Sequence, residues 1–291
     1  MKKILITGAT GNLGTLVVDG LIRKTGSENI SVLVRDLQKA VKLKEKGVQL
    51  IKGDYNDYNS LVSAFQGTDK LYFISGSDVI NRGAQHEKIV KAAKATNVGH
   101  IIYTSFQRKT DTSASPIAFI ASAHILAEKL IKESGLTYTI MKHALYADAV
   151  TMFIGDQVFN SGVIFLPAGN GKGSYTSKTD MASAGVSVLT GEGHENKTYE
   201  ISVDKSYTFY DIAVLLTELS GKKITYTNPD IQTFSTSLSK AGVPQEAIQA
   251  TTSFCQAIAQ GEFDFPAKTL EKLIGRKPES LKDFLKSAYK L

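Results

Sequence analysis

The sequence predicts an α/β protein of the Rossmann type, with a doubly wound parallel sheet and a smaller C-terminal α/β lobe. Through the first half of the chain, short and continuously apolar segments alternate with segments whose apolar residues recur at helical spacing. A glycine-rich segment joins the first expected strand to the first expected helix. Strands linked by helices form right-handed parallel units, and strands covered on both faces are apolar throughout. We therefore expect a ligand at the carboxyl ends of the strands.

The expected elements alternate regularly as far as residue 141. Strands are expected at residues 3–7, 30–34, 48–51, 71–74, 101–104 and 137–141. Helices are expected at residues 13–24, 37–46, 61–65, 84–96 and 121–133. Glycines follow several of these helices, as is typical of a helix stop.

The rhythm changes after about residue 150. Later elements are expected at residues 179–190 (helix), 198–203 (strand), 209–220 (helix) and 224–226 (strand), with mostly helix to residue 291. Thr208 has the side chain of an N-cap for the third of these, and Gly221 ends it. We therefore expect a Rossmann domain over residues 1–150 and a smaller substrate-binding lobe over residues 151–291, between which strands can be exchanged.

Composition limits the class of protein. The chain has 291 residues, a net charge of +6 and 42% hydrophobic residues, and no apolar run approaches the ~18 residues of a membrane span. The apolar stretch at the N-terminus is shorter than the ~7–15 residues of a secretion signal. A single cysteine, Cys255, excludes an intrachain disulfide and a cysteine-based zinc cluster. We expect a cytoplasmic monomer or homodimer with no metal, no membrane contact and, for want of an arginine-rich run, no nucleic-acid partner.

Three glycines, Gly8, Gly11 and Gly14, follow the first expected strand at the spacing GxxGxxG. Glycine permits a tight turn and lets the backbone approach a pyrophosphate, and the helix that follows offers free N–H groups to the anion. A bare turn needs only one glycine. The segment therefore predicts a dinucleotide site, with these expected contacts: Gly8, Thr10, Gly11, Asn12 and Leu13.

In such folds, residues at the end of the second strand contact the adenosine ribose of the dinucleotide. Arg35 lies there and can bind the 2′-phosphate of NADP bidentately. Asp36 follows it, and an inward carboxylate would instead favour NAD. The order of the two residues favours NADP(H).

Further segments, at residues 8–14, 34–36, 53–55, 73–76 and 102–105, resemble the NmrA-like atypical short-chain dehydrogenases. Residues 144–148 (ALYAD) and 191–199 (GEGHENKTY) are similar to the type-2 NADPH:quinone oxidoreductases and triphenylmethane dye reductases. The resemblance covers essentially the whole chain. It implies that Arg35 binds the 2′-phosphate, that Asp54 and Tyr55 lie by the adenine, and that Ser75 and Gly76 line the ribose and pyrophosphate. The other expected cofactor contacts are Thr104, Ser105, Met141, Lys142, His143 and Lys178.

Short-chain dehydrogenases use Tyr-x-x-x-Lys on the helix after the fifth strand to protonate the product. Here Lys129 is preceded at that spacing by Ile125, while His124 lies roughly 140° round the helix from Lys129. An alkoxide product needs a proton donor, whereas a quinone yields a phenolate with a pKa near ~10, and a triarylmethane cation needs no proton.

The sequence thus predicts an NADPH-dependent oxidoreductase that transfers hydride to a flat electrophile, a quinone or a triphenylmethane dye, by orienting the two reactants. Candidate catalytic residues are Tyr146, Lys129 and His143, with Phe106 as a further pocket wall. A non-catalytic NADP(H)-binding redox sensor of the NmrA type is the alternative. A reductase of an alcohol or sugar precursor is a third possibility, which Ile125 weakens.

Overall fold

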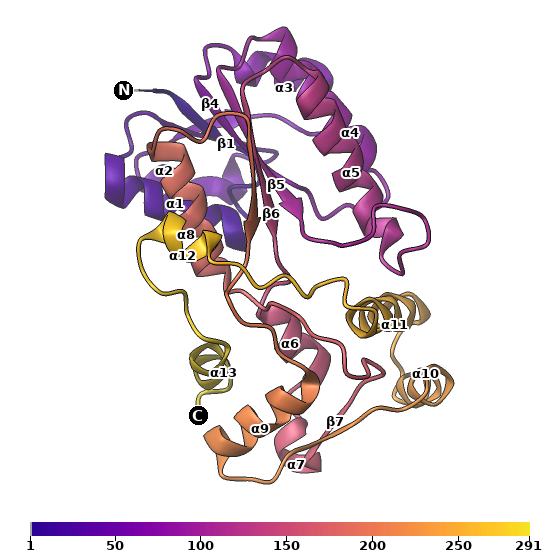
Figure 1. Cartoon of the computed structure of the whole chain (residues 1–291). Helices are drawn as coiled ribbons and strands as arrows, with labels where there is room; N and C mark the ends of the chain where they lie inside the picture. The colour runs from indigo at the N-terminus through magenta and orange to yellow at the C-terminus, as the bar shows by residue number, and fades with distance from the viewer. Residues whose placement is uncertain (1) are drawn as a thin grey trace.

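A computed structural model describes residues 2–291, so that Met1, with which the predicted first domain begins, lies outside the described residues. Its main element is a seven-stranded sheet in which every neighbouring pair is parallel (Figure 1). The strand order is β3-β2-β1-β4-β5-β6-β8, which reverses direction between β1 and β4. The strands are β1 (Ile4–Ile6), β2 (Ile30–Val34), β3 (Gln49–Lys52), β4 (Lys70–Ile74), β5 (His100–Phe106), β6 (Tyr138–His143) and β8 (Lys197–Ile201). The predicted doubly wound fold is confirmed.

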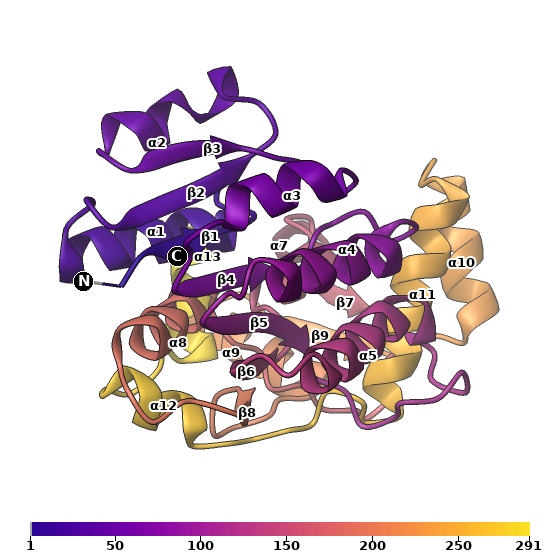
Figure 2. The same cartoon turned by 90° about the horizontal axis from the view of Figure 1, so that it is seen from above.

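Helices cover both faces of this sheet, as the view from above shows (Figure 2). One face carries α1 (Asn12–Thr25), α2 (Val41–Glu45), α8 (Lys178–Thr190) and α12 (Thr269–Ile274). The other face carries α3 (Tyr58–Phe65), α4 (Arg82–Ala95) and α5 (Ala118–Glu133). Because the strands are buried from both sides, β4 and β5 are apolar along most of their length.

A smaller lobe lies below the carboxyl ends of the strands (Figure 1). Its elements are α6 (Asp148–Ile154), α7 (Val158–Ser161), β7 (Val163–Phe165), α9 (Phe209–Ser220), β9 (Thr225–Thr227), α10 (Ile231–Lys240), α11 (Gln245–Ala259) and α13 (Leu281–Tyr289). Its two strands pair in parallel, and a separate apolar core fills it. The expected start of α9 is confirmed, since Thr208 forms a capping box with Asp211, and Gly221 ends the helix with φ 68°.

The chain crosses the expected boundary at residue 150 more than once. Strand β8 pairs with β6 in the main sheet, and α8 packs against α1 on its face. The smaller lobe is therefore made of three separate stretches, between which residues 178–201 and then α12 return to the Rossmann layers.

Two short stretches differ from the expected elements. The helix expected at 37–46 begins as a 3₁₀ turn, Gln38–Ala40, before α2. Elements α6, α7 and β7 follow residue 147 where none was expected, because each has only a few residues and shows no long periodic pattern. Within residues 2–291 no helix is long and apolar enough to cross a membrane.

Candidate functional site

The glycine loop lies at the point where the strand order reverses, between β1 and α1. Gly8 has φ 64°, a region that favours glycine, and its carbonyl accepts a hydrogen bond of 3.0 Å from the N–H of Gly11. A Cβ on Gly14 would lie 2.2 Å from the oxygen of Gly8. Glycine is therefore required at both ends of the loop, because the helix packs directly against the turn.

The N-terminus of α1 leaves its N–H groups free for an anion. Gly11 is the N-cap, no side chain caps the helix, and its first turn contains no acidic residue. Thr10 and Asn12 are exposed beside it, whereas Leu13 is buried in the core, so that only its backbone can reach a ligand. Free N–H groups and the helix dipole favour a phosphate here.

Arg35 follows β2 and is exposed, with no ion pair or side-chain hydrogen bond to any residue from 2 to 291. Asp36 turns toward its own loop, where its carboxylate accepts a hydrogen bond of 2.9 Å from the N–H of Gln38. The guanidinium is thus available to a phosphate, while the carboxylate is already engaged. This geometry favours a 2′-phosphate over a free ribose hydroxyl.

Asp54 and Tyr55 lie next to this region, after β3. The carboxylate of Asp54 accepts a hydrogen bond of 2.8 Å from the N–H of Asn56. The hydroxyl of Tyr55 donates to the carbonyl of Ile74 at 2.9 Å, and its burial raises the pKa of the phenol. Tyr55 therefore links the adenosine side of the expected site to the end of β4.

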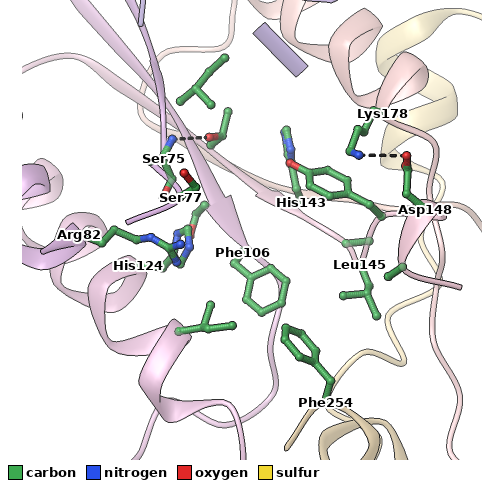
Figure 3. Close-up of a pocket in the computed structure, with 18 of the residues that line it drawn as sticks. Ser75, Ser77, Arg82, Phe106, His124, His143, Leu145, Asp148, Lys178 and Phe254 are labelled. Carbon is green, nitrogen blue, oxygen red and sulfur yellow. Dashed lines mark hydrogen bonds and ion pairs between the residues drawn. The ribbon is translucent and has the colours of Figure 1, made fainter. Parts of the chain in front are cut away.

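A cavity of about 480 Å³ opens beside the glycine loop, at the carboxyl ends of β4, β5 and β6. Its walls also come from α4, α5, α6 and α11, which converge on it (Figure 3). Large apolar side chains form much of its lining: Phe106, Leu145, Met152, Phe153 and Phe254. Such a lining with a few polar groups is typical of a small-molecule site.

Hydrogen bonds fix the polar residues where β4 ends. The N–H of Ser75 donates to Oγ1 of Thr104 at 3.1 Å. Nδ1 of His86 lies 3.1 Å from the carbonyl of Ala123, and since a carbonyl only accepts, this nitrogen carries the proton. Burial lowers the pKa of His86 to about 4, so the ring is neutral and its Nε2 accepts from the Ser75 hydroxyl at 3.1 Å.

Ser105 also lines the cavity but its hydroxyl is already engaged. It donates to the carboxylate of Glu128, which also receives two N–H bonds from Arg108, of 2.9 and 3.1 Å. The Arg108 side chain is buried, and its Nε pairs with Asp111 at 2.6 Å. This buried network holds β5 against α5, because a partner is present for each charge.

Lys178 lies on the side of the cavity away from Arg82 of α4 (Figure 3), and Tyr146 also lines the cavity. Nζ of Lys178 lies 5.0 Å from the centre of the Tyr146 ring and 3.0 Å from the carboxylate of Asp148. Burial, followed by the charge of Asp148, raises the pKa of Tyr146 to about 12. The phenol is therefore protonated near neutral pH.

His143, at the end of β6, faces the same cavity. Both of its ring nitrogens are buried without a hydrogen-bond partner among residues 2–291. Burial lowers the pKa of the ring to about 3, so it is neutral. A neutral imidazole has one donor and one acceptor, and neither is satisfied by another residue between 2 and 291.

Three expected site residues lie elsewhere. Lys129 is exposed on α5 and does not line the cavity. Met141 is fully buried in the core between the sheet and α1. Nζ of Lys142 points to the carboxylates of Glu128 and Glu200, at 3.9 and 4.0 Å. None of the three has a side chain at the cavity.

Other cavity residues were not expected from the sequence. Arg82 begins α4 and lines the cavity, as do Phe153 and Phe254 from the smaller lobe. His124, which we had set aside because of its position relative to Lys129, lies in the wall with them. No motif marks these residues, because distant segments bring them together.

Comparisons with known proteins agree with this geometry. Residues 1–288 match the NmrA-like family. The chain is 35% identical to quinone oxidoreductase 2 of Escherichia coli over 96% of each chain. Among solved structures, it is similar to the NADPH-dependent quinone oxidoreductase of Escherichia coli complexed with NADPH (TM-score 0.91, 34% identity, 98% and 99% of the two chains). It is also similar to the triphenylmethane reductase of Citrobacter sp. complexed with NADP(H) (TM-score 0.90, 36% identity, 98% and 99%).

Proposed function

This chain belongs to the NmrA-like family, and from that premise we propose that it transfers hydride from NADPH to a flat electrophile such as a quinone. It is an oxidoreductase that binds NADP(H), as the relatives with similar chains do. Our proposal concerns two points: that the acceptor is a flat electrophile, and that no Tyr–Lys pair donates a proton to the product.

The residues present fit an NADP(H) molecule. The glycine cradle leaves no room for a Cβ at Gly14, and the start of α1 supplies free N–H groups beside it. Arg35 provides a cation for the 2′-phosphate, while Asp36 is engaged by its own turn. When bound, NADPH supplies the hydride, and the protein supplies position and electrostatics.

The cavity carries the proposal. Phe106 and Phe254 present aromatic rings to it (Figure 3), and Tyr146 is a third aromatic residue of its lining. Flat aromatic walls suit a flat acceptor, since stacked rings bury apolar area at little entropic cost. The names of the relatives, a quinone oxidoreductase and a triphenylmethane reductase, support an acceptor of this shape.

The chain offers no tyrosine where short-chain dehydrogenases place one. Ile125 occupies that position, and Lys129 is exposed. The Tyr146 phenol is near, but its raised pKa makes it a weak acid. We propose that orientation of the acceptor supplies most of the rate and that solvent protonates the reduced product.

Mixing the purified protein with NADPH and a small quinone tests this function. We expect loss of nicotinamide absorbance that depends on both the quinone and the protein. Tight NADPH binding, measured by fluorescence, with no turnover of quinones or of a triphenylmethane dye would contradict the proposal and favour the redox-sensor alternative.

A further inference from the structure

Arg82 is a buried cation without an acidic partner. Its side chain lines the cavity and only 8% of the residue is exposed, yet Nε has no hydrogen-bond partner and no ion pair includes Arg82 among residues 2–291. The nearby carboxylate of Asp78 is engaged by Asn81 and Gln85 at 2.9–3.3 Å. A guanidinium stays charged at neutral pH, and buried charges are normally paired. The Arg82 guanidinium lines the cavity, and no carboxylate among residues 2–291 forms an ion pair with it.

His124 lies in the same wall, where Figure 3 shows it next to Arg82. Its Nδ1 is 2.7 Å from the hydroxyl of Tyr103. Burial, and after it the proximity of His86 and the charge of Arg82, holds the pKa of the ring well below its usual range. His124 is therefore neutral and carries a single ring proton. That proton lies on Nε2 when the Tyr103 phenol donates to Nδ1, which is the arrangement that the proposal below requires.

We propose that Nε2–H of His124 and the guanidinium of Arg82 together form an oxyanion site, which binds the carbonyl oxygen of the acceptor. The inference rests on the proposed reductase function and names its substrate class: neutral or anionic carbonyl acceptors, quinones above all. Tyr103 is a positioning residue that fixes the tautomer of His124.

The charge balance of the reaction explains why such a site helps. A quinone that accepts a hydride gains two electrons and one hydrogen, and leaves NADP⁺ behind. Its negative charge collects on an oxygen until one proton from solvent completes the hydroquinone. Donors aimed at that oxygen stabilise it more than they stabilise the neutral quinone, which lowers the barrier.

A triarylmethane dye provides the opposite case. It is a cation, it takes hydride on carbon to give a neutral product, and no oxyanion forms. Arg82 repels such a cation in a low-dielectric wall. The two acceptors should therefore respond to loss of Arg82 with opposite sign.

The test compares both acceptors in two variants, His124→Phe and Arg82→Met. We expect kcat/KM for a quinone to fall about 100-fold in each, the usual effect of removing one oxyanion donor. Dye reduction should fall far less than quinone reduction in His124→Phe, and should rise in Arg82→Met. Arg82→Lys should keep part of the quinone activity. Lys91→Met, which removes an exposed cation from the same helix, is the matched control.

Equal loss with both acceptors would overturn the inference, because it would show a structural role. Loss of NADPH affinity in Arg82→Met would also overturn it, because the arginine would then serve the cofactor. If the unmodified protein reduces neither acceptor, the reductase proposal itself fails. That outcome is distinct from an effect of the variants.

Ligand binding without turnover gives an independent measurement. With NADP⁺ present, 4-nitrophenol should bind as its coloured phenolate at a pH where it is largely protonated in solution. We expect both variants to abolish this shift in the pKa of the bound phenol. Nitrogen NMR of labelled histidine should show the proton of His124 on Nε2, and Tyr103→Phe should release that preference. An unshifted phenol in the unmodified protein would contradict an oxyanion site.

Discussion

The glycine loop and the cavity at the carboxyl ends of β4, β5 and β6 differ in how the sequence specifies them. The loop is a single run of residues, and its geometry depends on the side chains that Gly8 and Gly14 lack. The cavity depends on side chains from β4, β5, β6 and several helices, as distant in sequence as Arg82 and Phe254. A site made of backbone is therefore encoded locally, whereas a site made of side chains is encoded by the tertiary fold.

We expect the largest effect from a substitution that disrupts the glycine loop. In Gly14→Val, the added side chain would collide with the backbone at Gly8, and α1 would have to move off the turn. We expect NADPH binding to be abolished in calorimetric titration. Gly83→Ala is the control, because a Cβ there meets only Leu126 at 3.7 Å. Normal NADPH affinity in Gly14→Val would show that the loop does not need its close packing.

Lowering the pH should reduce the stability of the fold through buried neutral histidines, most of which lie near the cavity. His86, His124 and His143 line or support the cavity wall, and His100 is buried in the sheet. Each has a folded-state pKa below the ordinary 6.5.

Their contribution to stability is therefore present above pH 6.5 and is lost as the pH falls, because the unfolded chain takes up the protons. Between pH 6.5 and 5.5 each histidine should lower the free energy of unfolding by about 1 kcal/mol, and the four together by ~4 kcal/mol. Urea unfolding at both pH values measures this. His143→Gln should reduce the dependence on pH, and an unchanged slope would show that His143 does not remain neutral in the fold.

Arg35→Ala tests the expected contact with the 2′-phosphate at the adenosine end of the cofactor site. Loss of a charge-assisted pair with the 2′-phosphate should weaken NADPH binding by about 2 kcal/mol, roughly 30-fold, and leave NADH unaffected. Lys39→Ala, which removes an exposed cation from the next turn, is the control. An equal loss for both cofactors would show that Arg35 contacts a group other than the phosphate.

The smallest expected effect is at Lys129. Its side chain is exposed on α5, away from the cavity. Lys129→Ala should leave kcat and KM for a quinone within about twofold, as is usual for surface substitutions. A tenfold fall in kcat would return this lysine to the catalytic residues.

Much of the cofactor half followed from the sequence, because periodicity and glycine spacing report backbone geometry directly. The positions of β1 to β6 along the chain, the turn at Gly8 and the position of Arg35 after β2 all belong to this class. The residues of the cavity were harder to predict from the sequence. Lys129 was placed there by analogy with a helical spacing, yet the helix turns it to solvent.

No sequence motif or spacing identified His124 or Arg82 as residues of the cavity. The roles that we propose for them depend on Tyr103, on the engaged carboxylate of Asp78 and on the shape of the cavity. Those facts exist only once α4 and α5 have packed side by side on the sheet. Residues whose partners lie far along the chain cannot be identified from local spacing.

The return of the chain to the main sheet at β8 has a consequence for synthesis and folding. Strand β6 is complete by His143, but the strand that covers its outer edge ends only at Ile201. Until that stretch leaves the ribosome, β6 presents unpaired N–H and C=O groups, an edge on which other chains can add. A fragment cut at residue 150 would keep this edge permanently, and should aggregate instead of folding as an independent cofactor-binding unit.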